Sequence, residues 1–91
     1  MTARPKRLSP VQRRILTYLI AGGPARVATG FRDTRTGRST STGERWINTN
    51  ATTLWFLESD RLIIQDTPGP EQPYRANLSH PAVQRLAESR R

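Results

Sequence analysis

The sequence predicts one small α+β domain with about three helices, a two-stranded β-hairpin near the C-terminus and, on one of two interpretations, an extra hairpin in the middle. The chain has 91 residues, of which 34% are apolar, and this suffices for one hydrophobic core. Apolar residues recur at helical spacing in three stretches, which predicts three amphipathic helices. A β-branched run followed by a proline-rich stretch predicts the C-terminal hairpin.

The first helix is predicted over residues 10–21. Ser9 and Gln12 have the spacing of a capping box, and Pro10 suits the first helical turn, where its missing N–H costs nothing. The sequence Gly22-Gly23-Pro24 predicts the end of the helix. Residues 1–8 precede it without apolar periodicity, and we expect them to form a flexible basic arm.

Residues 25–43 are rich in glycine, serine, threonine and arginine and poor in apolar residues. They fit a β-hairpin whose arms, residues 26–32 and 39–47, flank a turn at residues 34–37. They also fit a short helical turn over residues 26–31 followed by a loose loop. Of the two, we expect the hairpin.

A second helix is predicted over residues 50–59. Three good N-cap residues, Asn48, Thr49 and Asn50, stand at its start. The apolar positions of this helix define a core face centred near Leu54.

Two strands and a last helix complete the predicted order of elements. The strands cover residues 62–64 and 74–78, and the proline-rich turn 67–73 separates them. Ser79 is expected to be the N-cap of the last helix, and Pro81 lies in its first turn.

Two segments of the chain carry a resemblance to a known family. Residues 53–63, which read TLWFLESDRLI, and residues 74–86, with Leu78-Ser79-His80-Pro81 at the helix start, are similar to the winged helix-turn-helix domains of the MarR and PadR families of bacterial transcription regulators. The resemblance implies that residues 53–63 join the recognition helix to the first strand of a β wing. It implies one winged-helix domain over residues 9–89, with residues 90–91 as a tail. The chain departs from the family in its possible middle hairpin, which replaces the usual second helix, and in Arg61, where the family places glycine.

Basic residues concentrate in the first half of the chain. Residues 1–46 carry ten basic and two acidic side chains, whereas residues 47–91 carry five of each. Fourteen of the fifteen basic residues are arginine, whose planar guanidinium group matches phosphate bidentately. A polyanionic partner is therefore the first hypothesis, and arginine at ordinary solvated positions is the alternative.

We expect double-stranded DNA to contact the basic arm, the arginine-rich middle segment, the outward face of the 50–59 helix and the wing. A solvated surface without a ligand is the alternative for each of these segments. The candidate DNA-binding residues are Arg4, Lys6, Arg7, Arg32, Arg35, Arg38, Asn48, Thr49, Thr52, Thr53 and Arg75.

The sequence does not decide whether the aromatic residues near the 50–59 helix pack in the core or contact a partner. Phe56 lies on the outward face, where either the middle segment or Trp46 covers it as part of the core, or it contacts DNA or a second subunit. Trp46 and Trp55 are expected to be packing residues.

The composition excludes several classes of function. The chain has no cysteine, which rules out disulfides, a thiolate zinc site and a cysteine nucleophile. With one histidine, His80, and no recognisable acid–base pair among seven carboxylates, we expect no catalysis, no metal and no cofactor. No apolar run approaches the roughly 20 residues that span a bilayer, and no secretion signal is evident, so we expect a cytoplasmic, nucleoid-associated protein without membrane contact.

The expected function is that of a bacterial or bacteriophage-type transcriptional regulator that binds a two-fold DNA site as a homodimer. The main alternative is a protein-interaction module on the same scaffold, which binds a polymerase subunit or a host protein. RNA binding is a third hypothesis, although the strands lack the aromatic-rich motifs of single-strand readers.

Overall fold

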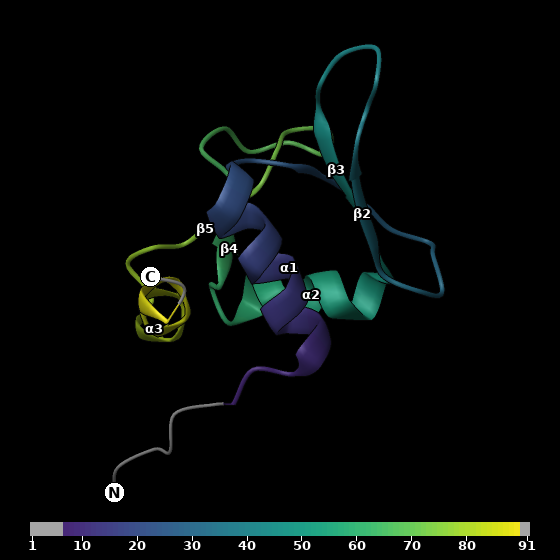
Figure 1. Ribbon diagram of the computed structural model, residues 1–91. Helices are drawn as coiled ribbons and strands as arrows, with labels where there is room; N and C mark the ends of the chain where they lie inside the picture. The colour runs from purple at the N-terminus through teal and green to yellow at the C-terminus, as the bar shows by residue number, and fades with distance from the viewer. Residues whose placement is uncertain (1–6, 90–91) are drawn as a thin grey trace, which may run out of the picture.

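The computed structural model describes residues 7–89 and contains three helices and five short strands (Figure 1). The predicted α+β class is confirmed. In chain order the elements are α1 (Pro10–Gly22), β1 (Arg26–Ala28), β2 (Arg35–Arg38), β3 (Arg45–Asn48), α2 (Ala51–Ser59), β4 (Ile63–Ile64), β5 (Arg75–Ala76) and α3 (Pro81–Glu88).

Helix α1 begins with the predicted capping box. The backbone N–H of Gln12 donates to Ser9 Oγ at 3.1 Å, and the Ser9 N–H donates to Gln12 Oε1 at 2.9 Å. The helix ends at Gly22, where Gly23 has a φ of 88° that an L side chain would resist. Both ends of α1 therefore follow from local chemistry.

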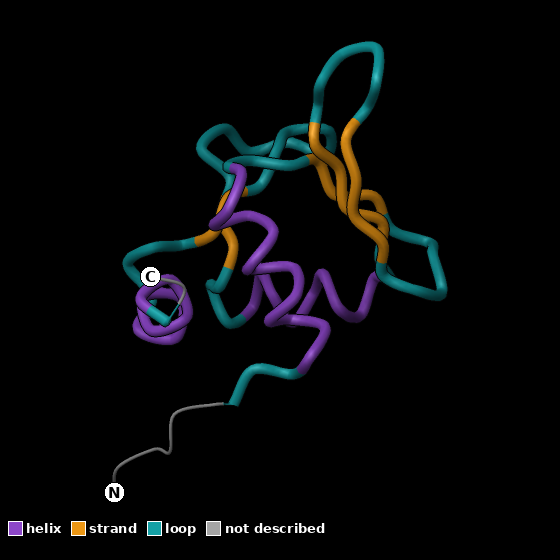
Figure 2. The backbone as a smooth tube through the Cα atoms, viewed as in Figure 1, coloured by secondary structure: helices purple, strands orange, loops and turns teal. Residues whose placement is uncertain are grey.

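The middle segment forms a three-stranded mixed sheet in the order β1-β3-β2. Strand β3 lies between β1, with which it pairs in parallel, and β2, with which it pairs antiparallel. Figure 2 shows the loop between β2 and β3 extending away from the helices. The expectation of a hairpin was correct in kind but wrong in its strands: residues 35–38, which include most of the predicted turn, form β2, and the turn lies at residues 39–44. The expected pairing of residues 26–28 with the 39–47 arm does occur, but in parallel.

One face of this sheet packs towards the helices. Ile47 is fully buried and Val27 packs against the same core. The other core residues come from the helices and from the ends of the loops: Ile15, Leu16, Leu19, Ala25, Leu57, Leu62, Ile63, Ala76 and Val83. Helix α1 runs through the middle of the molecule, with α3 on one side and the sheet on the other (Figure 1).

Helix α2 and the β4–β5 hairpin match their predicted places closely. Asn50 is the N-cap of α2, and its Oδ1 accepts from the Thr53 N–H at 2.7 Å. Strands β4 and β5 pair antiparallel over two residues each, and an isolated bridge joins Ala25, after α1, to Tyr74, which directly precedes β5. The predicted turn between the strands is confirmed, although the returning strand is shorter than expected.

The start of helix α3 differs from the prediction. His80, and not Ser79, is the N-cap, because its Nδ1 accepts the Ala82 N–H at 3.1 Å. Pro81 occupies the first helical position as expected. None of the helices within residues 7–89 is long and apolar enough to cross a membrane.

Candidate nucleic-acid interface

The exposed arginines of the middle segment lie on the three-stranded sheet and the loops that join its strands. Arg26 is on β1, Arg35 and Arg38 are on β2, and Arg32 is in the loop between these strands. All four are exposed. Arg32, Arg35 and Arg38 form no side-chain hydrogen bond or ion pair with the part of the chain that the structure describes. Their guanidinium groups are therefore available to a phosphate.

The sheet register arranges its outward-facing side chains in two rows. Residues directly opposite each other share a face of a sheet, and successive residues alternate between faces. Because Val27 and Ile47 face the core, their neighbours along each strand face outward. One outward row is Arg26, Trp46 and Gly37, and the next is Ala28, Asn48 and Arg35.

Trp46 lies across Gly37 in the first of these rows. A Cβ atom at position 37 would lie within 3 Å of Trp46 Cζ2, Cε2 and Cη2. The six-membered ring thus occupies the space that any other residue at position 37 would need. Trp46 is partly buried and packs against Gly37, as expected of a packing residue, and part of its side chain stays exposed.

A salt bridge crosses from β1 to the residue that precedes β3. Arg26 Nη2 lies 3.5 Å from Glu44 Oε1, and both side chains are about half exposed. An exposed pair of this kind contributes little to stability. Glu44 is the one carboxylate within the 39–44 turn.

Arg45 anchors the sheet to the C-terminal end of α1. Its guanidinium carbon lies 3.7 Å from the centroid of the Tyr18 ring, and the group donates to the carbonyl of Gly23 at 2.6 Å and to that of Tyr18. The Tyr18 hydroxyl in turn donates to the carbonyl of Gly37. Arg45 is therefore a structural arginine that its position in the basic half did not reveal.

Thr49 must be withdrawn from the candidate interface. It is fully buried, and its Oγ1 shares a hydrogen bond of 2.7 Å with Thr34 Oγ1. Thr49 also accepts the Phe31 N–H through its carbonyl at 3.2 Å. These bonds join the 29–34 loop to the start of α2, and they place Arg32 and the first turn of α2 at the same end of the sheet.

The outward face of α2 carries aromatic side chains and no cation. Trp55 is 61% exposed, so it is not the packing residue expected from the sequence, and Phe56, whose role the sequence left open, is 41% exposed. Their rings meet edge to face, with centroids 5.0 Å apart. Of the two threonines assigned to this face, Thr52 is exposed and Thr53 is partly buried.

Arg75 in the predicted wing has a partner within the chain. Its Nε donates to Asp66 Oδ1 at 2.7 Å, across the β4–β5 hairpin. A phosphate would have to compete with this carboxylate, which makes Arg75 the weakest of the predicted cationic contacts. Beside it, burial and the Glu58 carboxylate raise the pKa of Tyr74, which favours its neutral hydroxyl.

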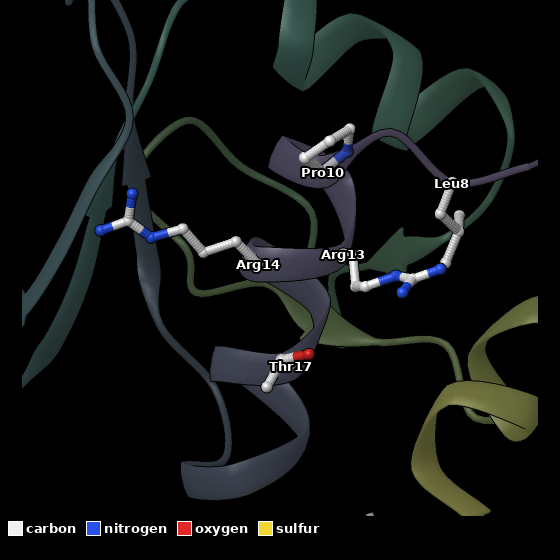
Figure 3. Close-up of a pocket in the computed structure, with 5 residues that line it drawn as sticks. All are labelled: Leu8, Pro10, Arg13, Arg14 and Thr17. Atoms are coloured by element: carbon white, nitrogen blue, oxygen red, sulfur yellow. The ribbon is translucent and has the colours of Figure 1, made fainter. Parts of the chain in front are cut away.

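The basic arm contributes one basic residue to the described structure. Arg4 and Lys6 lie outside the described residues, whereas Arg7 is exposed. The α1 surface next to it holds a depression lined by Leu8, Pro10, Arg13, Arg14 and Thr17. Figure 3 shows Arg13 extending beside Leu8 while Arg14 points to the other side of the helix, so the two cations do not converge on one ligand.

The predicted contacts therefore separate into an exposed group on the sheet and its loops, and a dispersed remainder. Asn48 joins the sheet group, since it is partly exposed on the outward face of β3. No cluster of three or more potential metal ligands occurs within residues 7–89. Comparisons with protein-family models, with curated proteins and with solved structures find no match for this chain.

Proposed function

We propose that the protein binds double-stranded DNA, with the arginines of the three-stranded sheet and its loops on the phosphate backbone. The observation that carries the proposal is the set of three exposed arginines, Arg32, Arg35 and Arg38, which form no ion pair with a carboxylate of residues 7–89. Guanidinium groups can contact the phosphates of DNA of any base sequence, and each such contact releases counterions that were condensed on the DNA. Binding of this kind is directed mainly to the backbone.

Helix α2 has a smaller part in this proposal than the sequence alone suggested. Its exposed polar groups near the sheet are those of Thr52 and, in part, Thr53, which can contact a base edge or a phosphate. Thr52 lies in the first turn, directly after β3 and Asn50. Any sequence preference would therefore arise where α2 meets the sheet.

The order of elements supports a winged-helix relationship. A helix followed by a short antiparallel hairpin, as in α2, β4 and β5, is the arrangement of a recognition helix and its wing. The bridge between Ala25 and Tyr74 joins the segment after α1 to that hairpin. On this proposal the three-stranded sheet takes the place of the second helix, and the protein is a transcriptional regulator.

Salt-dependent binding tests the proposal. We expect affinity for a mixed-sequence duplex, measured by fluorescence anisotropy, to fall steeply with salt. We expect the Arg35→Ala/Arg38→Ala variant to bind more weakly, and the slope of its log affinity against log salt concentration to be smaller in magnitude by about one to two. The Arg13→Ala/Arg85→Ala variant loses the same charge from α1 and α3, and we expect its slope to match that of the parent. Absence of duplex binding at low salt, or equal effects of the two double variants, would contradict the proposal.

The exposed aromatic face of α2 favours a second candidate function, contact with another protein chain. Trp55, 61% exposed, is a large apolar side chain of the kind that concentrates binding energy at interfaces. If a homodimer forms here, Trp55→Ser will lower the mass measured by sedimentation equilibrium towards that of a monomer. Because the side chain is exposed, the variant's free energy of unfolding per monomer should change by no more than about 0.5 kcal/mol.

A further inference from the structure

We infer that the outward face of the three-stranded sheet binds an unpaired stretch of DNA, with Trp46 stacking on a base. The inference rests on the proposed DNA binding and specifies the form of DNA that the sheet selects. Arg26 and Arg35, on the same face as Trp46, would hold the backbone on either side of the unpaired base.

The position of Trp46 in the sheet is the first support. It lies on the central strand β3, with Arg26 beside it on β1 and Gly37 beside it on β2. Neighbouring strands are about 4.8 Å apart, so the Arg26 side chain leaves the backbone next to Trp46. The second row places Arg35 at the opposite edge, two residues further along the sheet.

Small residues lie beside the ring, and Trp46 is partly exposed. Gly37 has no side chain, and the six-membered ring of Trp46 lies in the space that a Cβ atom at Gly37 would take. Ala28, in the second row, is exposed and adds only a methyl group. None of the three helices lies over this face, since α1 and α2 are on the core side (Figure 1).

The chemistry of the face matches a single strand. Proteins that bind unpaired nucleic acid combine aromatic rings, on which bases stack, with cations that follow the backbone. Here Trp46 provides the ring, Arg26 and Arg35 provide the cations, and the Asn48 amide can donate to or accept from a base edge. Glu44 opposes binding, because its carboxylate forms a salt bridge with Arg26 and would compete with a phosphate for this side chain.

The place of the ring on the outward face of the sheet explains why the DNA should be unpaired. Within a duplex both faces of each base are covered by its neighbours, so a tryptophan on the surface of a sheet finds no base face to contact. A base at an overhang or a gap exposes a face at little cost. We therefore expect the sheet to prefer a duplex with an unpaired stretch to a blunt duplex.

The fluorescence of Trp46 provides the first test. Trp55→Phe leaves Trp46 as the sole tryptophan, and its folding can be checked by circular dichroism. We expect oligo(dT) to quench the emission of this variant, and oligo(U) to quench it less. Unchanged emission while DNA is bound, measured by anisotropy of labelled DNA, would overturn the inference, and so would stronger quenching by oligo(U), which would indicate an RNA site.

Substitution of Trp46 provides the second test. We expect the parent protein to bind a duplex with a single-stranded overhang about tenfold more tightly than a blunt duplex. The Trp46→Leu variant should lose this preference, and the control variant Trp55→Leu should keep it. A preference that survives Trp46→Leu would overturn the inference, as would its absence in the parent. If salt-dependent duplex binding remains without any preference, the proposed function stands and this inference fails. If no DNA is bound at low salt, both fail.

Discussion

Glu44 is the residue best placed to weaken binding at the proposed DNA interface. It pairs with Arg26 at 3.5 Å on a half-exposed surface, where a phosphate would compete with it. Because an exposed pair contributes roughly 0.2–1 kcal/mol, we expect Glu44→Gln to tighten binding to a duplex about two- to fivefold at low salt. Anisotropy titrations measure this change, and Glu88→Gln on α3 serves as the control for the loss of one negative charge. Equal gains from the two variants would show that net charge alone is responsible.

Arg61 illustrates a second effect at the scale of one residue. It is the one non-glycine residue among 7–89 with a positive φ, 56°, in the turn that leads from α2 to β4. This is the position at which the winged-helix domains that the sequence resembles place glycine. Since an L residue in this region costs roughly 1–2 kcal/mol, partly offset by the greater freedom of an unfolded glycine, we expect Arg61→Gly to raise the free energy of unfolding by about 0.5–1 kcal/mol. Urea denaturation tests this, and an unchanged or lower value would show that the Arg61 side chain stabilises the turn.

At the scale of elements, the attachment of the sheet to α1 depends on a few polar contacts. The Tyr18 hydroxyl donates to the Gly37 carbonyl, while the Tyr18 ring supports the Arg45 guanidinium. Tyr18→Phe removes the hydrogen bond and keeps the ring, so we expect a loss of about 0.5–1.5 kcal/mol in the free energy of unfolding. In this variant, amide hydrogen exchange should accelerate more in β2 than in α3, relative to the parent protein. The exposed-loop control Thr40→Ala should change neither the free energy of unfolding nor the exchange rates. Equal acceleration throughout the chain would contradict a local attachment.

The same elements show which parts of the fold a sequence can reveal. The start of α1 and that of α2 were predictable because Ser9, Gln12 and Asn50 act on backbone groups within three residues. The three-stranded sheet was not predictable, because the positions of its glycines depend on contacts between residues that are far apart in the sequence. Gly37, expected in a turn, lies beneath Trp46, whereas Gly43, with a φ of 74°, is the turn glycine.

The candidate site was predictable to a similar extent. Arg32, Arg35 and Arg38 are exposed, as their charge implies. The burial of Thr49 could not be foreseen, because its hydrogen-bonding partner Thr34 is 15 residues away in the chain. For the same reason the structural role of Arg45 appears only when α1 and β3 are brought together.

At the scale of the whole molecule, the charge separation seen in the sequence becomes a cationic sheet set against a more neutral helical side. Residues 1–46 hold the entire excess of eight positive charges, and the described structure contains two arginine–carboxylate salt bridges, one on each side. Salt screens repulsion among exposed charges. We therefore expect the melting temperature to rise by a few degrees between 50 and 500 mM NaCl, with a smaller rise for Arg35→Ala/Arg38→Ala. A melting temperature that falls with salt would show that attractive pairs dominate.

The central position of β3 also constrains the order in which the sheet assembles. Strands β2 and β3 are separated by six residues, so this hairpin closes a short loop and can form in microseconds. Strand β1 can pair only with the opposite edge of β3, and this closes a loop that contains all of β2. We expect the β2–β3 hairpin to be present in the folding transition state and β1 to dock later, which makes the contact between Val27 and Ile47 a late event on the folding pathway.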